Sequence, residues 1–280
     1  MTDQTMVGRT VLVTGASDGI GAEAARVLAS RGATVHVTGR SADKLRPVAE
    51  AVGTEPLVAD FSRLDDVRRL AAQVAERVDS LDVLMNNAGG TFSPKKVTHD
   101  GHEPNFQIDH LAPFLLTNLL HPKLTAAGSS LVVNTSSIGN LMGKIVLDDL
   151  DYEHRRAIEL PAYGTGKLMN IVFTRGIAQR WSSDGVVSVA VHPGPVGSSF
   201  GRDSWFVGLL YRSPLKGLAT ISVADGAAPL IALAERGPDP EIDGRYFSRF
   251  SIDGRENKQA HDQAVIDGLW EKSAALVGLG

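Results

Sequence analysis

Short apolar segments alternate along the chain with longer segments in which apolar residues recur every three or four positions. The short segments are rich in β-branched residues and predict strands, whereas the wider spacing predicts helices with one buried face. The expected strands cover residues 10–14, 34–38, 56–59, 81–85, 130–134 and 186–191, with 244–247 as a seventh. The expected helices run from about 20 to Gly32 and over residues 42–52, 64–78, 101–120, 162–181, 222–235 and 258–275.

Strands that alternate with helices predict a parallel sheet covered by helices on both faces. The strands are continuously apolar, as expected of strands buried on both sides. Ser62, with Asp65 three residues later, is expected to be the N-cap of the helix at 64–78. No low-complexity linker divides the chain. We therefore expect residues 1–280 to form a single α/β domain with a doubly wound parallel sheet of about seven strands.

Composition and charge narrow the function classes. The 280 residues carry a net charge of −4, which argues against a nucleic-acid-binding protein with a basic face. The chain has no cysteine, which excludes disulfides, thiol nucleophiles and cysteine-ligated metals. Its longest apolar stretches fall short of the about 20 residues of a membrane helix, and no charged-then-apolar leader opens it. We expect a cytoplasmic protein without a transmembrane segment.

The sequence TGASDGIG, residues 14–21, lies between the first expected strand and the first expected helix. Glycines allow a tight turn and a close approach of the backbone to a phosphate, and the helix N-terminus presents free N–H groups. A glycine turn without a ligand is the alternative. The position within a βαβ unit favours a dinucleotide pyrophosphate.

The end of the second strand distinguishes NADP from NAD. Its sequence, VTGR at 37–40, lacks the acidic residue that would bind the ribose hydroxyls of NAD. A guanidinium at Arg40 suits the 2′-phosphate of NADP through charge-assisted hydrogen bonds. We therefore predict NADP (NADPH) in preference to NAD, the alternative being that Arg40 is a solvated loop residue.

Five segments, in order and each near the end of an expected strand or on the helix that follows, resemble motifs of the short-chain dehydrogenase/reductase family. They are the TGxxxGxG-like Thr14–Gly21, the acidic Asp60, the NNAG motif at Asn86–Gly89, the set Ser137, Tyr163 and Lys167, and Pro193-Gly194. The resemblance covers about residues 8–278 and implies a single-domain Rossmann fold. The segments 100–117, 148–150, 244–247 and 269–273 look like the retinol-dehydrogenase-like and WW-domain-oxidoreductase-like branch, which implies a hydrophobic carbonyl or alcohol substrate.

The resemblance also implies which residues bind the cofactor: Gly15, Ser17, Asp18, Gly19, Ile20, Gly21, Arg40, Asp60, Phe61, Asn87, Ala88, Gly89, Tyr163, Lys167, Pro193, Gly194, Val196 and Ser198. Ser199 is an alternative to Ser198, and either is equally well explained as a plain loop serine. Asp18 is a mild counter-signal to NADP, because some members of the family have a basic residue there.

Tyr163 is the expected acid and base, because a phenol can protonate the alkoxide that forms when a carbonyl accepts a hydride. Lys167 lies four residues later on the same helix face, and its cation favours the phenolate. By the resemblance, Lys167 also binds the nicotinamide ribose and Ser137 binds the substrate oxygen. An exposed Tyr–Lys pair with no role is the alternative.

Asp109, in FQIDHL, stands where the family has a catalytic asparagine that supports a water-mediated proton relay. A carboxylate can hold a water, but it cannot donate a hydrogen bond as an amide does unless it is protonated. An ionised Asp109 would also favour the protonated forms of Lys167 and Tyr163. We expect either an adjusted relay or reduced activity with a more alkaline optimum.

The aromatic-rich segment near 197–215 is expected to be a lid over the substrate, with core packing, an oligomer contact or a membrane-surface patch as alternatives. His99 and His102 have no third ligand at a useful spacing, so no metal site is expected. Relatives often form dimers or tetramers through the helices that follow the fourth and fifth strands, so a homodimer or homotetramer is possible.

The sequence therefore favours an NADP-dependent oxidoreductase that interconverts a carbonyl and an alcohol. A catalytically weakened NADP-binding regulatory or scaffold protein is the first alternative, supported by Asp109 alone. A sugar-nucleotide epimerase or dehydratase is the second, although only about 85 residues follow Pro193-Gly194, which is short for a substrate domain of that class.

Overall fold

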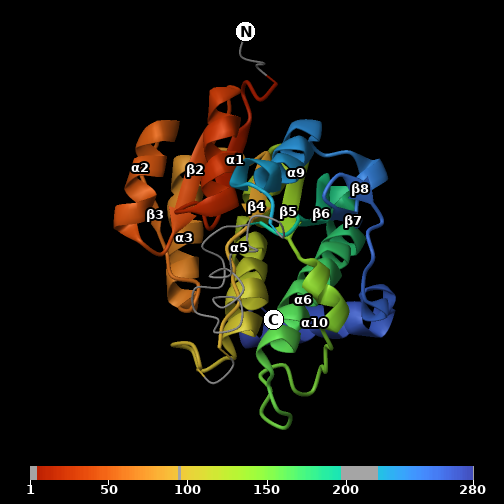
Figure 1. The fold of residues 1–280 in the computed structure, drawn as a ribbon. Coiled ribbons are helices and arrows are strands. Elements are labelled where there is room, and N and C mark those ends of the chain that lie inside the picture. Colours follow the sequence, from red (N-terminus) through yellow and green to blue (C-terminus); the bar gives the residue numbers. More distant parts are fainter. Residues whose placement is uncertain (1–4, 94–95, 197–219, 280) are drawn as a thin grey trace.

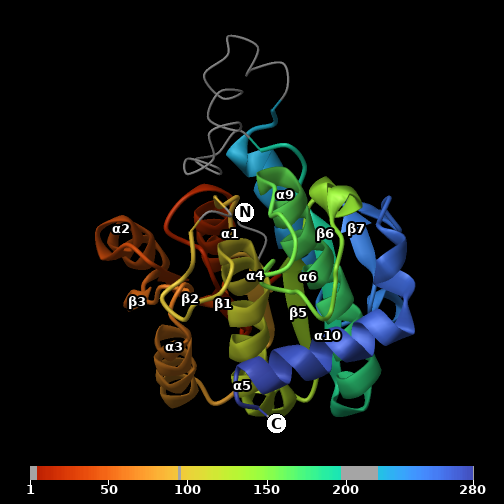
Figure 2. The same cartoon turned by 90° about the horizontal axis from the view of Figure 1, so that it is seen from below.

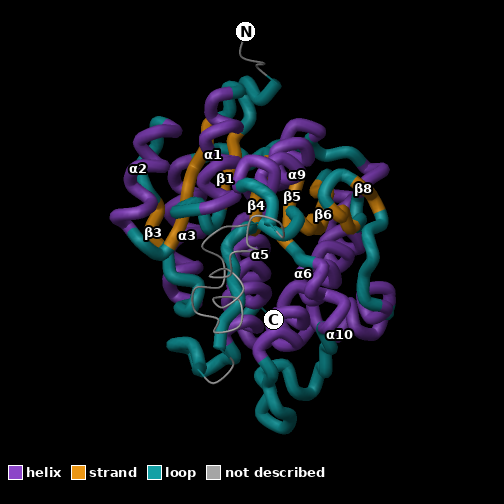
Figure 3. The backbone as a smooth tube through the Cα atoms, in the orientation of Figure 1, coloured by secondary structure: helices purple, strands orange, loops and turns teal. Residues whose placement is uncertain are grey.

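The computed structural model describes residues 5–93, 96–196 and 220–279, and its strands form one sheet (Figures 1 and 3). The spatial order is β3-β2-β1-β4-β5-β6-β7-β8. All neighbouring strands are parallel except the last pair, which is antiparallel. The strands are β1 (Thr10–Val13), β2 (Thr34–Gly39), β3 (Leu57–Val58), β4 (Val83–Asn86), β5 (Ser130–Thr135), β6 (Val186–His192), β7 (Tyr246–Ser248) and β8 (Ser251–Ile252).

Alternate residues of the central strands point into two separate hydrophobic cores, one on each face of the sheet. Leu12 of β1 belongs to one core and Val11 and Val13 to the other. The first core includes α3 (Leu64–Arg77), α5 (Ala112–Ala126), α6 (Glu159–Trp181) and α10 (Gln263–Leu276). The second core includes α1 (Gly19–Ser30), α2 (Ala42–Val52) and α9 (Val223–Arg236). The doubly wound α/β sheet expected from the sequence is thus confirmed, with eight described strands in place of about seven.

The extra strand, β8, has two residues and pairs Phe247 and Ser248 with Ile252 and Ser251. The interpretation of Ser62 as a helix cap is wrong, since α3 begins after Arg63, without a side-chain cap. The backbone N–H of Leu64 instead donates to Asp100, which lies 36 positions further along the chain. A cap supplied from such a distance leaves no local pattern in the sequence.

The helix expected over residues 101–120 is interrupted near its start. It begins as α4 (Pro104–Phe106), passes through a π-helical turn at Gln107–Leu111 and continues as α5 to Ala126. Pro104 occupies the first turn, and Glu103 caps it by accepting from the N–H of Phe106. The wider π turn contains Asp109. Single π turns inside helices occur frequently at functional sites.

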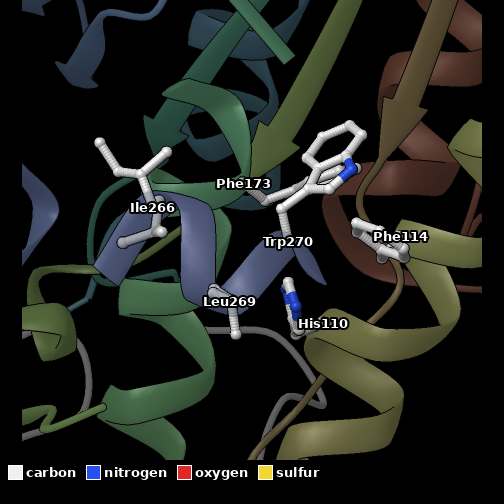
Figure 4. A pocket seen from close by; sticks show the side chains of 7 residues that line it. His110, Phe114, Phe173, Ile266, Leu269 and Trp270 are labelled. Carbon is white, nitrogen blue, oxygen red and sulfur yellow. The ribbon is translucent and has the colours of Figure 1, made fainter. Parts of the chain in front are cut away.

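The C-terminal helix α10 lies across α5 and α6, as Figure 2 shows. Trp270 on α10 contacts Phe114 of α5 and Phe173 of α6, with ring centroids 5.1 and 5.8 Å away (Figure 4). A Cβ at Gly176 would lie 2.9 Å from the Trp270 ring, so the glycine permits this close approach. Among the described helices, none is long and apolar enough to cross a membrane.

His110 lies next to this aromatic cluster and is 1% exposed. Its Nε2 lies 2.9 Å from the hydroxyl of Ser273 on α10, which joins the π turn to the C-terminal helix. Burial lowers the pKa of His110 to about 3. The side chain is therefore neutral in the folded protein at neutral pH.

A neutral buried histidine makes stability depend on pH. Below about pH 6.5 the unfolded chain binds a proton at His110 that the folded chain does not. The free energy of unfolding therefore decreases as the pH is lowered from about 6.5 to the folded pKa near 3. We expect this residue alone to cost about 2 kcal/mol at pH 5. His110→Gln should show a correspondingly shallower loss of stability between pH 7 and pH 5 in urea unfolding. His154 is exposed, so His154→Gln serves as the control and should lose stability with pH as the wild type does. If stability depends on pH equally in His110→Gln and in the wild type, the assignment is contradicted.

Candidate active site

A cleft of about 630 Å³ opens at the carboxyl ends of β1, β2, β4, β5 and β6, the edge at which open α/β sheets bind ligands. Residues that the sequence singled out line it together: Gly15, Ser17, Asp18, Gly19, Ile20, Gly21, Arg40, Asp60, Phe61, Asn87, Ala88, Gly89, Ser137, Tyr163, Lys167, Pro193, Gly194 and Val196. Asp109 lies outside the lining and is fully buried. Ser198, Ser199 and the lid expected near 197–215 fall outside the described residues.

The glycine loop is held against the end of β4 by Thr14 and Asn87. The Thr14 hydroxyl donates to the carbonyl of Met85 and accepts from the N–H groups of Asn87 and Ala88, at 2.9–3.1 Å. The Asn87 amide donates back to the Thr14 carbonyl at 3.0 Å. Gly15 has a φ of +67°, and a Cβ there would lie 2.7 Å from the Cα of Ala88. Only glycine therefore allows the two loops to approach this closely.

Three buried hydroxyls along the cleft fit an extended polar ligand. The Oγ of Ser17 and the Oγ1 atoms of Thr38 and Thr135 have no hydrogen-bond partner among the described residues, and all three residues line the cleft. Buried hydroxyls normally find a partner. Together with the glycine loop and the N-terminus of α1, they match the donors and acceptors that a dinucleotide requires.

Two basic side chains lie at the β2 end of the cleft. Arg40 and Lys44 are exposed and line it beside Ser41. Asp18 acts as the N-cap of α1, where its carboxylate accepts from the N–H of Gly19 at 2.8 Å. Asp60 accepts from the N–H of Ser62 at 2.9 Å and lines the same region.

Ser137, Tyr163 and Lys167 meet at the other part of the cleft. Ser137 lies two residues after the end of β5, and its hydroxyl accepts from the N–H of Gly139 at 3.1 Å. A Cβ placed on Gly139 would lie 3.1 Å from the Tyr163 ring and 3.4 Å from the Ser137 Oγ, so both side chains flank the same glycine. The Lys167 ammonium lies 5.7 Å from the centre of the Tyr163 ring.

Asp109 lies behind Lys167. Its Oδ1 accepts from the Lys167 Nζ at 3.1 Å and from the N–H of Gly90 at 2.9 Å. A Cβ on Gly89 would lie 2.2 Å from that Oδ1 and 2.9 Å from the Nζ, so only glycine at position 89 allows the loop to cover the pair. Burial raises the pKa of the Asp109 carboxyl, and the nearby Lys167 opposes that rise.

Several supporting residues were not singled out from the sequence. The Ser136 hydroxyl donates to the Lys167 carbonyl at 2.7 Å, and the Asn170 amide donates to the Thr135 carbonyl at 3.0 Å, which fixes α6 against the end of β5. The Asn140 amide donates to the Ser137 carbonyl at 2.8 Å. In the sequence, Asn140 and Asn170 are recognisable only as polar residues among apolar neighbours, and this pattern does not reveal which groups they bond to.

A ladder of buried polar side chains crosses the sheet below the cleft. The Asn86 amide donates to Thr117 and to Asn134, and the Asn134 amide donates to Thr174 and Ser188, at 2.9–3.3 Å. Thr117 belongs to α5 and Thr174 to α6, so these bonds fix the lateral positions of both helices against the sheet. His102 is engaged elsewhere, with its Nδ1 2.9 Å from Asp151, and His99 is exposed.

The sequence of this chain matches the family model for short chain dehydrogenase over residues 9–205. The chain belongs to the short-chain dehydrogenase family. It is 35% identical to human retinol dehydrogenase 13, over 98% of this chain and 86% of that protein. It is 38% identical to a Streptomyces protein provisionally named daunorubicin C-13 ketoreductase DnrU, over 97% of this chain and 93% of that one.

A solved structure of an uncharacterised protein from Mycobacterium paratuberculosis superposes with a TM-score of 0.78. The two chains are 31% identical, and the match covers 97% of this chain and 94% of the other. The retinol-dehydrogenase-like resemblance expected from the sequence is confirmed. Family membership makes this short-chain dehydrogenase an NAD(P)-binding oxidoreductase of the carbonyl–alcohol type.

The link between the glycine loop and β4 can be tested at Thr14. We expect Thr14→Val to leave the N–H of Ala88 without its partner, while the N–H of Asn87 keeps its bond to the Met85 carbonyl, and to lower the free energy of unfolding by about 1–3 kcal/mol. Thr14→Ser retains the hydroxyl and should recover most of that loss. Denaturant unfolding of the three proteins provides the measurement. Equal stability of the Val and Ser variants would show that the hydroxyl does not hold the loop.

Proposed function

We propose that this protein is an NADP-dependent oxidoreductase that interconverts a hydrophobic ketone or aldehyde and the corresponding alcohol, with Tyr163 as the acid and base. The observation that carries the proposal is the common cleft, in which Ser137, Tyr163 and Lys167 lie beside the glycine loop of residues 14–21. We treat residues 1–280 as one dinucleotide-binding domain, because one continuous sheet supplies both parts of the cleft.

A bound nicotinamide accepts or supplies the hydride. In the reductive direction, the Tyr163 phenol donates its proton to the carbonyl oxygen; in the oxidative direction, the phenolate removes the proton of the alcohol. Ser137 orients that oxygen by donating a hydrogen bond, which keeps it within reach of Tyr163. Lys167 supplies a buried positive charge beside the phenol, and its ammonium also suits the ribose hydroxyls.

The preference for NADP rests on Arg40 with Lys44 and Ser41. Their side chains offer two cations and a hydroxyl at the β2 end of the cleft. No acidic residue occupies residues 37–40. The 2′-phosphate of NADP is therefore attracted by these cations, whereas the ribose hydroxyls of NAD lack the carboxylate that would bind them. The hydroxyls of Ser17 and Thr38, which have no hydrogen-bond partner among the described residues, belong to residues that line the same cleft.

Apolar side chains around Ser137 and Tyr163 support a hydrophobic substrate. The cleft is lined there by Phe92, Ile138, Met142 and Leu160. Ile138 and Met142 are 46% and 51% exposed, and large exposed apolar side chains at a cleft favour an apolar ligand. Relatives whose names refer to retinol and daunorubicin agree with this substrate class.

Cofactor choice is tested by titrating NADPH and NADH and following nicotinamide fluorescence. We expect Arg40→Ala to weaken NADPH binding by about 10–100-fold and to change NADH binding by less than about threefold, since one charge-assisted contact to the phosphate is lost. Arg46→Ala, an exposed arginine on the same helix as Lys44 that does not line the cleft, is the matched control. Equal losses for both cofactors would contradict the assignment.

Tyr163→Phe tests the acid and base. We expect turnover of NADPH with a panel of hydrophobic aldehydes and ketones to fall by about 10²–10⁴-fold, while NADPH binding is retained, because only the transferable proton is removed. Tyr152→Phe is the matched control, since its hydroxyl donates to Thr165 outside the cleft. Wild-type protein that binds NADPH but reduces no carbonyl would favour a cofactor-binding regulatory role.

A further inference from the structure

We propose that Asp109, by pairing with Lys167, cancels much of the positive charge beside Tyr163 and so keeps the tyrosine a phenol, which specialises this site for carbonyl reduction over alcohol oxidation at neutral pH. The inference rests on the proposed function, since it assigns a direction to that same reaction. Asp109 touches neither the cleft nor its contents. It is a positioning residue that acts through Lys167.

The pair is enclosed. The Asp109 side chain is fully buried and that of Lys167 is 3% exposed. The Nζ lies 3.1 Å from the Asp109 Oδ1 and 3.5 Å from the Thr135 carbonyl. The Gly90 N–H, 2.9 Å from the same Oδ1, holds the carboxylate in place. Burial this complete removes most solvent screening, so the charge of Asp109 is felt beyond Lys167.

The effect on Tyr163 follows from the order of the groups. The ammonium lies 5.7 Å from the Tyr163 ring centre, where a lone cation stabilises the phenolate. With the Asp109 carboxylate 3.1 Å from the ammonium, the ion pair has no net charge, and the stabilisation of the phenolate falls to that of a dipole. A neutral amide at position 109 would leave the full positive charge acting on the phenol.

Other titratable groups near the pair do not replace this effect. Glu103, the cap of α4, is buried and interacts electrostatically with Asp109, and burial raises the pKa of its carboxyl. His110 is directed toward Ser273 on α10. At the end of β6, burial lowers the pKa of His192 to about 4, so it is neutral at neutral pH. Lys167 is therefore the cation that the described residues place against Tyr163, and Asp109 is its carboxylate partner.

A phenol serves reduction and a phenolate serves oxidation. Reduction delivers one proton from Tyr163 to the oxygen of the carbonyl as its carbon receives the hydride from the reduced nicotinamide. Oxidation runs in reverse, and the phenolate takes that proton as the hydride returns to the oxidised nicotinamide. Raising the pH needed to form the phenolate thus extends the range of the reductive reaction and moves the onset of oxidation to higher pH.

The experiment compares wild type with Asp109→Asn, which changes the charge and preserves the shape. Tyrosinate absorbance of the protein without substrate is followed against pH, and the curve of a Tyr163→Phe partner is subtracted in each background, which isolates Tyr163 from the other three tyrosines. We expect Tyr163 to ionise about one to two pH units lower in Asp109→Asn.

Asp82→Asn provides the matched control, because this partly buried carboxylate lies at the opposite end of the sheet, where it accepts from the N–H of Thr10. It should leave the Tyr163 titration unchanged. Circular dichroism across the pH range confirms folding, and Asp109→Ala replaces the Asn variant if that variant does not fold. Coincident titrations of Tyr163 in wild type and in the neutral variant would overturn the inference.

Kinetics provide the second readout. With NADPH and benzaldehyde, and with NADP⁺ and benzyl alcohol, the onset of oxidation should move to lower pH by the same one to two units in Asp109→Asn. The alkaline decline of reduction should move with it. Wild-type protein without turnover would count against the proposed function, whereas the tyrosine titration judges the role of Asp109 independently.

Discussion

Lys167 carries its ammonium group inside the protein, and the surrounding structure is arranged to compensate this buried charge. An ammonium removed from water must be paired or hydrogen-bonded. Asp109 supplies the opposite charge, and the Thr135 carbonyl supplies a dipole. Three separate parts of the fold must converge for this: the π turn before α5, the end of β5 and the middle of α6. The Ser136 hydroxyl then fixes the Lys167 backbone, so the position of the charge and the docking of the helix are determined together.

The same convergence connects the two parts of the cleft. Gly89 and Gly90 cover the Asp109–Lys167 pair, and the preceding Asn87 is bonded to Thr14 at the start of the glycine loop. The end of β4 therefore contacts both the glycine loop and the buried Asp109–Lys167 pair. A direct connection of this kind suits a reaction in which donor and acceptor atoms must be held in register.

The C-terminal helix extends this support from outside. Trp270 of α10 packs on Phe114 and Phe173, and Ser273 bonds to His110, the residue next to Asp109. The face of α5 and α6 beneath α10 is thus covered by this chain itself. The π turn that presents Asp109 is held on one side by the aromatic core and on the other by the loop after β4. Its unusual geometry is stabilised by packing that is distant in sequence.

The sequence by itself determined the order of strands and helices and the glycine turn, because apolar periodicity and turn chemistry are local properties. Ser137, Tyr163 and Lys167 were singled out by their resemblance to a family motif. It also identified Asp109 as a departure from the family pattern. Only the tertiary structure decided that Asp109 binds Lys167, that Asp100 caps α3 and that Asn86 and Asn134 form a ladder across the sheet. Each of these contacts joins residues at least 36 positions apart. No short-range pattern records such contacts, because they form only when the two cores bring separate elements together.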